Sequence, residues 1–149
     1  MKLKVYLDTS VFSAFYDQRL PDRLSATREF WLHLVDLEAG TSEISRKEIE
    51  ETTDPGLRAN LLELLASVTV IPVSSDMEGA AMRYVEQGAF TTSMYNDALH
   101  VAAAVLTRHD VLVSWNYKHL VNRRRRSLIN QINVNAGWPT IEIAAPAEM

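Results

Sequence analysis

The residues of this sequence best suited to chemistry are acidic and amide side chains that lie beside apolar segments. Asp8 ends the apolar run LKVYL, and Asn116 directly follows the run VLVSW. Asp97 lies near the start of a helical pattern, and Glu48 lies in a polar segment. Clustered carboxylates raise each other's pKa unless a divalent cation lies between them. These four oxygen-bearing side chains would suit Mg²⁺ or Mn²⁺, which usually keep several waters as well.

The composition narrows this chemistry further. The chain has no cysteine among its 149 residues, so disulfides and thiolate chemistry are excluded and a metal would need oxygen or imidazole ligands. The net charge is −4, yet residues 1–90 contain 9 Lys and Arg against 15 Asp and Glu, whereas residues 91–149 contain 6 against 4. An acidic chain is a poor general binder of polyanions, but a local basic region beside an acidic centre could still hold a phosphate chain.

Length and hydropathy predict one compact domain spanning residues 1–149. The chain is 47% hydrophobic and 23% charged, which suits a single hydrophobic core. No window approaches the roughly 18–20 consecutive apolar residues of a membrane span, and Asp8 comes too early for a secretion signal. We therefore expect a cytoplasmic protein that has no membrane partner.

Segments typical of strands alternate with segments typical of helices. Runs of apolar and β-branched residues predict strands at residues 3–7, 41–45, 68–73, 111–115 and 140–146. Helical spacing and cap residues predict helices at residues 9–17, 24–39, 45–52, 54–68, 75–90, 92–110 and 117–133. The alternation predicts an α/β fold, a three-layer α/β/α sandwich around a mostly parallel sheet. In such sheets the working site lies at the carboxyl ends of the strands.

Position within these elements decides between neighbouring acidic residues. Glu48 and Glu51 are three residues apart and adjacent on a helix, and Glu48 is the better candidate because it is closer to the end of a strand. Asp97 lies near a helix start, where the helix dipole favours a negative charge. Asp110 precedes its strand and is therefore expected at the opposite edge of the sheet, which excludes it from the site.

Each candidate also has a simpler structural interpretation. Asp8 and Asn116 are favoured helix N-cap residues. Ser45 and Glu48 match the S-x-x-E capping box, which needs no metal. Asp97 could serve only to complement a helix dipole, a contribution of about 0.3–1 kcal/mol at a surface. These interpretations stay open on the sequence alone.

The histidine and arginine side chains near the candidates have less certain roles. His100 is expected to pack or to form hydrogen bonds, because Mg²⁺ prefers oxygen ligands. Successive residues of a helix turn by about 100°, so within the arginine run only Arg123 and Arg126 share a side. These two arginines are candidates for contact with substrate phosphates, and a solvated helix face or a bridge to an acidic partner is an equal alternative.

Five segments, in order, resemble a known family over nearly the whole chain. They are VYLDTSVFSAFYD, SEISRKEIEE, NDALHVAAA, DVLVSWNYKHL and IEIAAP. Together they resemble the PIN-domain family, and particularly the VapC-like ribonuclease toxins of type II toxin-antitoxin pairs. The resemblance implies an α/β/α fold that gathers acidic side chains around Mg²⁺ or Mn²⁺ and cleaves RNA with a metal-activated water.

The resemblance assigns roles to individual residues. Asp8 matches the first aspartate of the family, and Ser10 matches the small polar residue two positions later. Glu48 is similar to the helical glutamate, with Glu51 as the alternative, and Asp97 matches the aspartate of the DALH helix.

Asn116 departs from the pattern, because the family commonly has an aspartate after the third strand. An amide carries no charge, so chemistry with one metal ion is more consistent with this chain than a tightly held pair.

These observations lead to one principal hypothesis, a Mg²⁺- or Mn²⁺-dependent endoribonuclease. Asp8, Glu48 and Asp97 would bind the metal and Asn116 would assist catalysis. Three residues would contact the substrate: Ser10, Arg123 and Arg126. The expected partners are an RNA substrate, a cognate antitoxin protein and a second copy of the chain in a homodimer.

Two other classes of function remain as alternatives. One is a catalytically weak or inactive PIN-like module that binds RNA or protein, since Asn116 removes one charge from the site. The other is a phosphatase that uses Asp8 as a covalent nucleophile, but the haloacid-dehalogenase-like pattern requires a second aspartate where this chain has Ser10.

Overall fold

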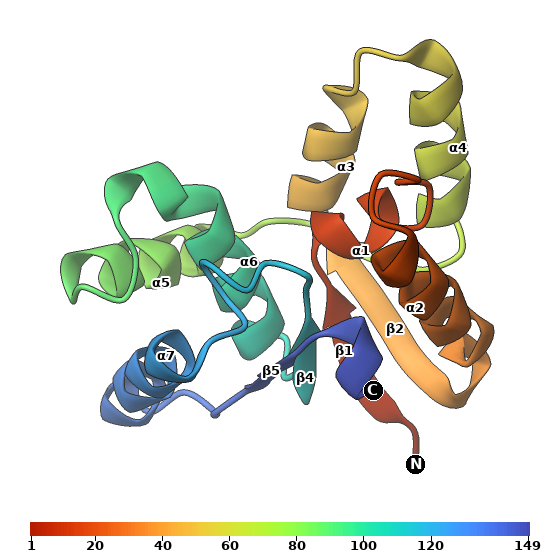
Figure 1. Cartoon of the computed structure of the whole chain (residues 1–149). Coiled ribbons are helices and arrows are strands. Elements are labelled where there is room, and N and C mark those ends of the chain that lie inside the picture. Colours follow the sequence, from red (N-terminus) through yellow and green to blue (C-terminus); the bar gives the residue numbers. More distant parts are fainter.

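Five parallel strands form the centre of the molecule, and helices cover both faces of the sheet (Figure 1). The computed structural model describes all residues, 1–149. The strand order is β3-β2-β1-β4-β5, and every neighbouring pair is parallel. The strands are β1 (Leu3–Leu7), β2 (Leu37–Ser42), β3 (Thr69–Ile71), β4 (Val111–Val113) and β5 (Glu142–Ala144). The predicted α/β/α sandwich is confirmed.

Helices connect the strands, as expected where parallel strands need crossover connections. They are α1 (Thr9–Ser13), α2 (Pro21–Leu32), α3 (Glu43–Glu50), α4 (Pro55–Leu65), α5 (Ser75–Glu86), α6 (Tyr95–Leu106) and α7 (Arg123–Ala136). Short 3-10 turns cover Leu34–Asp36, Thr92–Met94 and Pro146–Glu148. None of the helices has the length and apolar character needed to cross a bilayer.

Alternation along the central strand β1 divides the core into two parts, because successive side chains of a strand point to opposite faces. Val5 and Leu7 pack in a cluster with side chains of α1, α2 and α4, and Tyr6 packs in a larger cluster with α5, α6 and α7. Figure 1 shows these two groups of helices on opposite sides of the sheet. All three of these β1 side chains have no exposed surface, so the carboxyl end of β1 is held firmly.

The segment around Gly40 differs from its prediction. The expected helix over residues 24–39 ends at Leu32, and β2 spans Leu37–Ser42 in place of a strand at 41–45. Leu37 pairs with Leu3 and Gly40 with Tyr6 of β1. A Cβ atom at Gly40 would lie 3.3 Å from the Thr69 carbonyl oxygen, so the glycine permits close packing against β3 and does not end a helix. Pairing between strands overrides the weak strand propensity of these residues.

The last helix also begins later than predicted. Residues 117–120 form a turn, and α7 starts after Asn122, whose side chain accepts a hydrogen bond from the backbone NH of Arg125 at 2.8 Å. Gly137 ends the helix with a positive φ of 77°, a conformation that glycine adopts without strain. The predicted start at residue 117 is therefore wrong, because Asn122 and not Asn116 caps this helix.

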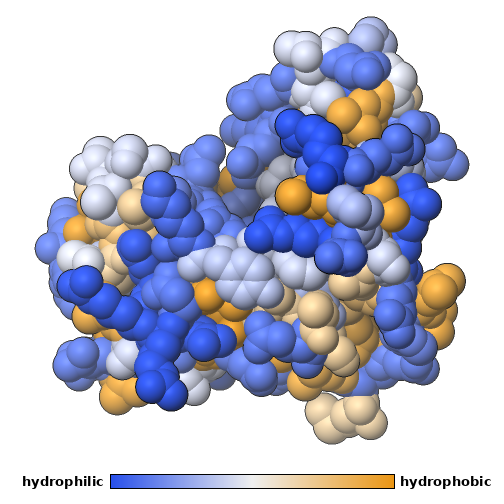
Figure 2. All heavy atoms as spheres, viewed as in Figure 1, coloured by the Kyte–Doolittle hydropathy of each residue, from blue (hydrophilic) through white to orange (hydrophobic).

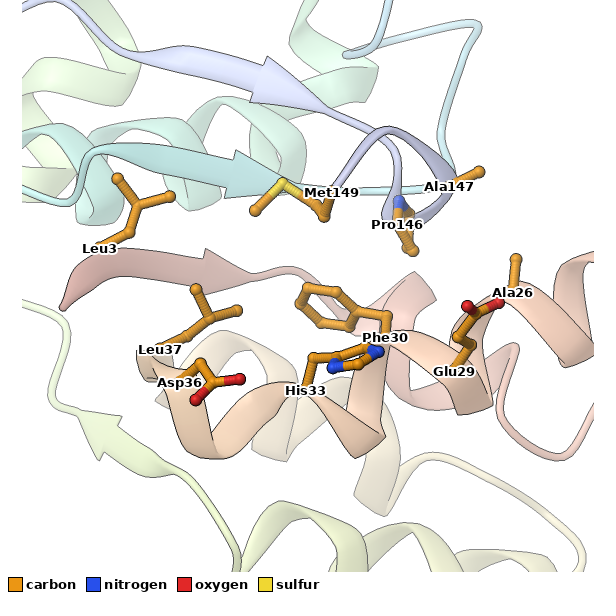
Figure 3. Close-up of a pocket in the computed structure, with 10 residues that line it drawn as sticks. All are labelled: Leu3, Ala26, Glu29, Phe30, His33, Asp36, Leu37, Pro146, Ala147 and Met149. Carbon is orange, nitrogen blue, oxygen red and sulfur yellow. The ribbon is translucent and has the colours of Figure 1, made fainter.

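A hollow of about 550 Å³ lies between α2 and the C-terminal residues (Figure 3). Leu3 and Leu37, the first residues of β1 and β2, line it. Pro146, Ala147 and Met149, which follow β5, line it as well, so it extends along α2 from the amino ends of β1 and β2 to the C-terminal turn. None of the candidate residues Asp8, Glu48, Asp97 and Asn116 lines it, so this hollow is not the candidate active site.

Candidate active site

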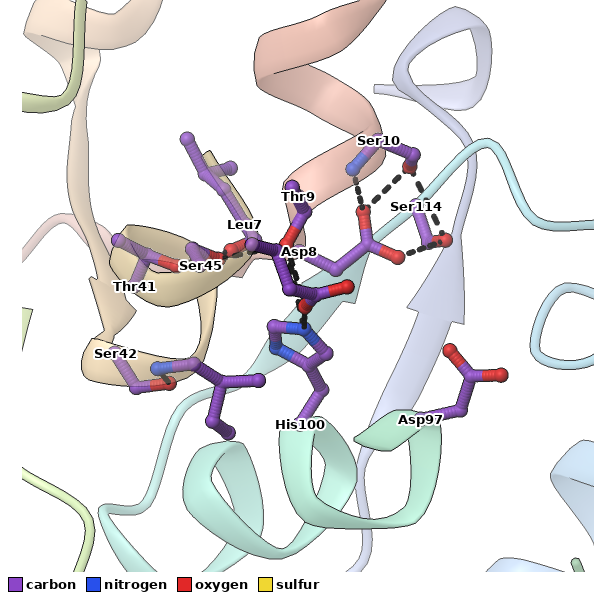
Figure 4. Close-up of polar contacts among 12 residues, drawn as sticks. Leu7, Asp8, Thr9, Ser10, Thr41, Ser42, Ser45, Asp97, His100 and Ser114 are labelled. Atoms are coloured by element: carbon purple, nitrogen blue, oxygen red, sulfur yellow. Dashed lines mark hydrogen bonds and ion pairs between the residues drawn. The ribbon is translucent and has the colours of Figure 1, made fainter. Parts of the chain in front are cut away.

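Asp8 lies at the carboxyl end of β1 and is also the N-cap of α1. Its Oδ1 accepts hydrogen bonds from the Ser10 NH at 3.0 Å and from Ser10 Oγ at 2.5 Å, and its Oδ2 accepts one from Ser114 Oγ at 2.5 Å (Figure 4). Only 4% of Asp8 is exposed. The N-cap interpretation is thus correct for Asp8. The same residue also lies at the carboxyl edge of the sheet, where the candidate site is.

The electrostatic setting of Asp8 disfavours its charge. Burial raises the pKa of its carboxyl group, and the negative charge of Asp97 raises it further, whereas His100 and the two serine hydroxyls lower it. Asp8 forms no ion pair with any cationic side chain. Asp8 is therefore a buried carboxylate, and the only groups that contact its charge directly are neutral hydrogen-bond donors. Such an arrangement is costly unless a cation binds nearby.

The loop after β4 is fixed to the same carboxylate. The backbone NH of Trp115 donates to Ser10 Oγ, and that of Asn116 donates to Ser114 Oγ, both at 2.9 Å. The Asn116 side chain points back to its own turn, because its Oδ1 accepts a bond from the NH of His119 at 2.9 Å. Asn116 therefore caps this turn and orders the loop.

Glu48 belongs to a buried chain of hydrogen bonds that begins on the sheet. Its Oε1 accepts bonds from Thr9 Oγ1 at 2.9 Å and from His100 Nε2 at 2.8 Å. His100 Nδ1 lies 2.7 Å from the hydroxyl oxygen of Tyr6, which lies 2.7 Å from Ser42 Oγ. An ionised carboxylate can only accept, so Nε2 carries a proton. The expectation that His100 forms hydrogen bonds is confirmed.

These contacts keep Glu48 ionised. Burial alone would raise the pKa of Glu48, but the hydrogen bond and charge of His100, together with the bond from Thr9, outweigh it and lower the pKa. Glu51, the alternative candidate, is exposed at the C-cap of α3 and has no bond to this network.

The capping-box interpretation of Glu48 is wrong. The N-cap of α3 is Ser42, whose side chain accepts from the NH of Ile44. Ser45 lies inside the helix, and its hydroxyl oxygen contacts Thr41 Oγ1 at 2.7 Å. Glu48 is therefore free of any capping role, because its carboxylate faces Thr9 and His100.

Asp97 lies in the first turn of α6. Figure 4 shows its carboxylate directed toward the side where Asp8 and Ser114 meet. Its Oδ2 lies 2.9 Å from His119 Nδ1, and the backbone of His119 is in turn held by Asn116. The helix-dipole interpretation is consistent with this position, but it does not account for the pairing with His119.

The surface is hollowed beside these residues. Figure 2 shows a depression bordered by hydrophilic side chains, between the part of the molecule that contains α5 and α6 and the part that contains α3 and α4. A hollow of about 520 Å³ lies there. It is lined by Glu43, Ile44, Lys47, Glu48, Glu51, Pro72, Val73, Glu78, Asn96 and Leu99. Glu48 is thus accessible from an acidic depression.

The carboxylate oxygens of Asp8, Glu48 and Asp97 are ligands that suit a hard cation, although the three side chains do not form one compact group. No three histidine, aspartate or glutamate side chains lie close enough together to hold a metal ion in this conformation. Hydrogen bonds occupy only Oδ2 of Asp97 and Oε1 of Glu48, so the second oxygen of each remains free. With Asp8, these side chains offer the oxygen ligands that Mg²⁺ and Mn²⁺ accept.

The arginines of α7 divide into different roles. Arg126 donates to the Ile143 carbonyl oxygen of β5 at 3.0 Å, and Arg125 donates to the Ala89 carbonyl oxygen. Both therefore fix α7 to the rest of the fold. Arg123 and Arg124 are exposed and form no ion pair. Among the two predicted substrate-binding arginines, Arg123 is the one whose guanidinium is free.

Sequence reasoning missed several residues that organise this site. Ser114 and Thr9 bond the two key carboxylates, Tyr6 supports His100, and His119 pairs with Asp97. A polar Ser114 at the end of the apolar run VLV was a usable signal. The role of Tyr6 could not be predicted from the sequence, because an aromatic residue inside a strand is ordinarily part of the core.

The sheet is all-parallel, and acidic residues that follow β1 or belong to α3 and α6 lie near its carboxyl edge. The chain is therefore an α/β protein with an acidic candidate site at the ends of its strands. Residues 5–119 match the PIN domain, and the chain belongs to the PIN-domain family. No curated protein matches the sequence.

Solved structures with this fold include several toxin-antitoxin proteins. VapBC2 from Rickettsia felis, bound to a promoter DNA fragment, is 15% identical with a TM-score of 0.61, covering 95% of this chain and 97% of that one. VapBC from Salmonella typhimurium is 18% identical with a TM-score of 0.58, covering 97% and 98%. VapC20 from Mycobacterium tuberculosis, a toxin that cleaves the sarcin-ricin loop, is 14% identical with a TM-score of 0.60, covering 77% and 92%. The predicted PIN-like, VapC-like fold is confirmed.

Proposed function

We propose that this protein is a Mg²⁺- or Mn²⁺-dependent endoribonuclease and the toxin of a toxin-antitoxin pair. Membership of the PIN-domain family and the fold shared with VapC toxins support the proposal. The observation that carries it is Asp8, a carboxylate that is 4% exposed, has no cationic partner and lies within reach of the charge of Asp97. A bound divalent cation would remove the cost of this arrangement.

We assign Asp8, Asp97 and Glu48 as the residues that hold the ion, with Asn116 supporting the loop beside them. When bound, the ion would activate water as the nucleophile and offset the charge of the scissile phosphate. The serine hydroxyls orient the Asp8 carboxylate.

His100 acts through Glu48. It is 2% exposed and bonded on both ring nitrogens, so it fixes the direction of the glutamate from within the core. Ser10 is committed to Asp8 and to the loop after β4. In this proposal Ser10 therefore orients Asp8 and the loop after β4, and it contacts the substrate only at the edge of the site. Arg123 contacts a phosphate of the substrate.

The partner proteins follow from the same comparison. Two of the similar structures are VapBC toxin-antitoxin proteins, and we infer that a small antitoxin protein binds this chain and silences it. We also infer a homodimer. Growth arrest on expression, relieved by Asp8→Ala and by the antitoxin gene, would support the toxin role, and unimpaired growth would contradict it.

Cleavage of a mixed RNA pool by the purified protein tests the enzymatic proposal. We expect cleavage with Mg²⁺ or Mn²⁺, none with chelator, and a loss of at least about 100-fold in Asp97→Asn, since a metal ligand is removed. Asp76→Asn is the matched control, because Asp76 also lies in the first turn of a helix, α5, and is exposed. It should cleave like the wild type.

Three results would count against the proposal. Equal degradation in all lanes would indicate a contaminating nuclease. RNA binding without metal-dependent cleavage would favour the alternative of an inactive PIN-like binding module. A trapped phosphoaspartyl intermediate on Asp8 would instead favour a phosphatase.

A further inference from the structure

The loop after β4, which is bonded to Ser10 at the candidate active site, carries an exposed aromatic side chain. Tyr117 follows Asn116 in the loop after β4, and 45% of it is exposed. Its hydroxyl group has no hydrogen-bond partner in the protein, and its ring packs edge-on to Trp115 with 6.3 Å between the ring centroids. Buried tyrosines of this chain bond their hydroxyl groups, as Tyr6 and Tyr84 do. Tyr117 is therefore partly exposed to solvent and has no polar partner in the protein.

The backbone under this ring is fixed. The NH of Tyr117 donates to the Trp115 carbonyl oxygen at 3.0 Å, and the Tyr117 carbonyl oxygen accepts a bond from Asn122 Nδ2 at 3.1 Å. Trp115 is 7% exposed, and its Nε1 donates to Thr27 Oγ1 on α2 at 2.8 Å. The ring thus stands on a rigid base, which lowers the entropy lost when a ligand binds.

A cation without an ion-pair partner accompanies the ring. The guanidinium carbon of Arg23, on α2, lies 5.3 Å from the centroid of Trp115 and 5.6 Å from that of Tyr117. None of the ion pairs of the protein involves Arg23, and none involves Lys118, the exposed residue next to Tyr117. Arg23 therefore places an unpaired positive charge over the two aromatic rings, and Lys118 adds a second at the next position of a chain whose net charge is −4.

The same loop connects this surface to Asp8. The NH of Trp115, two residues before Tyr117, donates to Ser10 Oγ, and Ser10 Oγ donates to Asp8 Oδ1. A ligand on Tyr117 would consequently lie close to the catalytic edge, at a distance that a single-stranded substrate can span.

We propose that Tyr117 is a stacking platform for one base of a single-stranded RNA and that Arg23 and Lys118 hold the adjoining phosphates. This inference rests on the proposed ribonuclease function and names its substrate contacts. Proteins bind single strands by combining aromatic side chains, on which bases stack, with cations that follow the backbone. A partly exposed ring on a rigid base, with one unpaired cation over it and a second on the next residue of the chain, has this composition.

Binding of a short fluorescent single-stranded RNA of mixed sequence, measured by anisotropy with chelator present to prevent cleavage, tests the proposal. We expect Tyr117→Ala to weaken binding by about 5- to 100-fold, the usual contribution of one stacked base, and Tyr117→Phe to bind like the wild type. An abasic RNA of equal length should bind the wild type and Tyr117→Ala equally. Arg23→Ala should reduce the slope of log affinity against log salt concentration by about 0.7.

Arg28→Ala is the matched control for charge. Arg28 also lies on α2 and also lies over an aromatic ring, that of Phe15, at 5.0 Å. It should leave both affinity and salt slope nearly unchanged. Thermal melting of every variant shows whether the fold is retained.

The outcomes separate this inference from the proposed function. If the wild type cleaves RNA and Tyr117→Ala binds and cleaves equally well, the platform is wrong and the nuclease stands. If Tyr117→Ala binds RNA normally but loses affinity for the antitoxin, the surface is a protein interface and the inference is overturned. If the wild type cleaves RNA with Mg²⁺ but does not bind RNA in the presence of chelator, the platform is wrong and the nuclease stands, and if it neither binds nor cleaves RNA, both proposals fail.

Discussion

Each carboxylate of the candidate site is held by a different set of partners. Asp8 has hydroxyl and amide donors only, Glu48 has a histidine and a threonine, and Asp97 has a histidine at the surface. The pKa of Asp8 is raised and that of Glu48 is lowered. The same type of side chain is thus placed in opposite electrostatic settings, and carboxylates whose pKa is shifted by burial and by specific partners are typical of functional sites.

Replacement of Tyr6 by phenylalanine tests the buried chain that supports Glu48. Tyr6→Phe leaves the buried His100 Nδ1 without its partner, and an unsatisfied buried polar group costs about 1–3 kcal/mol. We expect a loss of that size in the free energy of unfolding, measured with urea, together with slower RNA cleavage.

Tyr84→Phe provides the matched control. Tyr84 has no exposed surface either, and its hydroxyl group donates to Asn133 Oδ1 on α7, within the core on the α5 side of the sheet. It should lose comparable stability and keep its cleavage rate once folded. Equal loss of cleavage in both variants would show that Tyr6 acts only through stability.

His109 predicts a dependence of stability on pH. It is 6% exposed, and burial lowers its pKa to about 4, with the charge of Lys4 as a further cause. An unfolded chain has an ordinary histidine pKa of about 6.5, so it binds more protons than the native state between these values. The contribution of His109 to stability is complete above about pH 6.5 and is lost as the pH falls toward about 4, by an amount on the order of 3 kcal/mol.

Urea unfolding at a series of pH values measures this effect in the wild type and in His109→Asn. The Thr107 hydroxyl group donates to the Ala103 carbonyl oxygen, so its oxygen accepts from the His109 Nδ1 proton, and an asparagine amide can supply the same donor. The variant should lose less stability between pH 6.5 and 4. Parallel curves for the two proteins would contradict the assignment.

At the scale of elements, caps and apolar runs were predictable and strand pairing was not. The run LKVYL and the Asp54 cap predicted β1 and α4 correctly. Leu37–Ser42 was not recognisable as a strand, because its residues form a strand only by pairing with β1. The candidates Asp8, Glu48 and Asp97 were found from their positions at element ends, whereas the partners of these side chains depend on contacts between distant segments and left little trace in the sequence.

Replacement by alanine should change the stability of the protein in opposite directions at two glycines, one inside a helix and one at a helix end. Gly79 lies inside α5, where an added Cβ atom would have no other atom within 4 Å, and Gly137 ends α7 with a φ of 77°. Gly79→Ala should stabilise the protein by about 0.5–1 kcal/mol, since alanine is the better helix former. Gly137→Ala should destabilise it by about 1 kcal/mol, because a side chain strains the left-handed conformation.

Thermal melting of both variants checks this pair, and neither should change RNA cleavage. Shifts of the same sign would mean that the two positions do not differ in the backbone conformation that the structure assigns to them.

At the scale of the whole molecule, the topology brings together what the sequence separates. Asp8, Glu48 and Asp97 are far apart in the chain, but β1 is the central strand, and α3 follows β2 directly at the same edge. Parallel strands with crossover helices place all these segment ends on one side. The acidic side chains therefore lie at the same edge of the sheet, although they do not form one compact group in this conformation.

Metal binding should consequently stabilise the entire fold. A ligand that binds only the native state adds about 2.7 kcal/mol at 100 times its Kd, which corresponds to a rise of about 5–10 °C in Tm for a chain of this size. We expect such a concentration-dependent rise with Mn²⁺ in the wild type and in Asp76→Asn, and little or none in Asp97→Asn. Differential scanning fluorimetry with K⁺ at matched ionic strength separates site binding from screening. An equal rise in Asp97→Asn and Asp76→Asn would place the ion elsewhere on the acidic surface, and the assignment of Asp97 as a ligand would then be wrong.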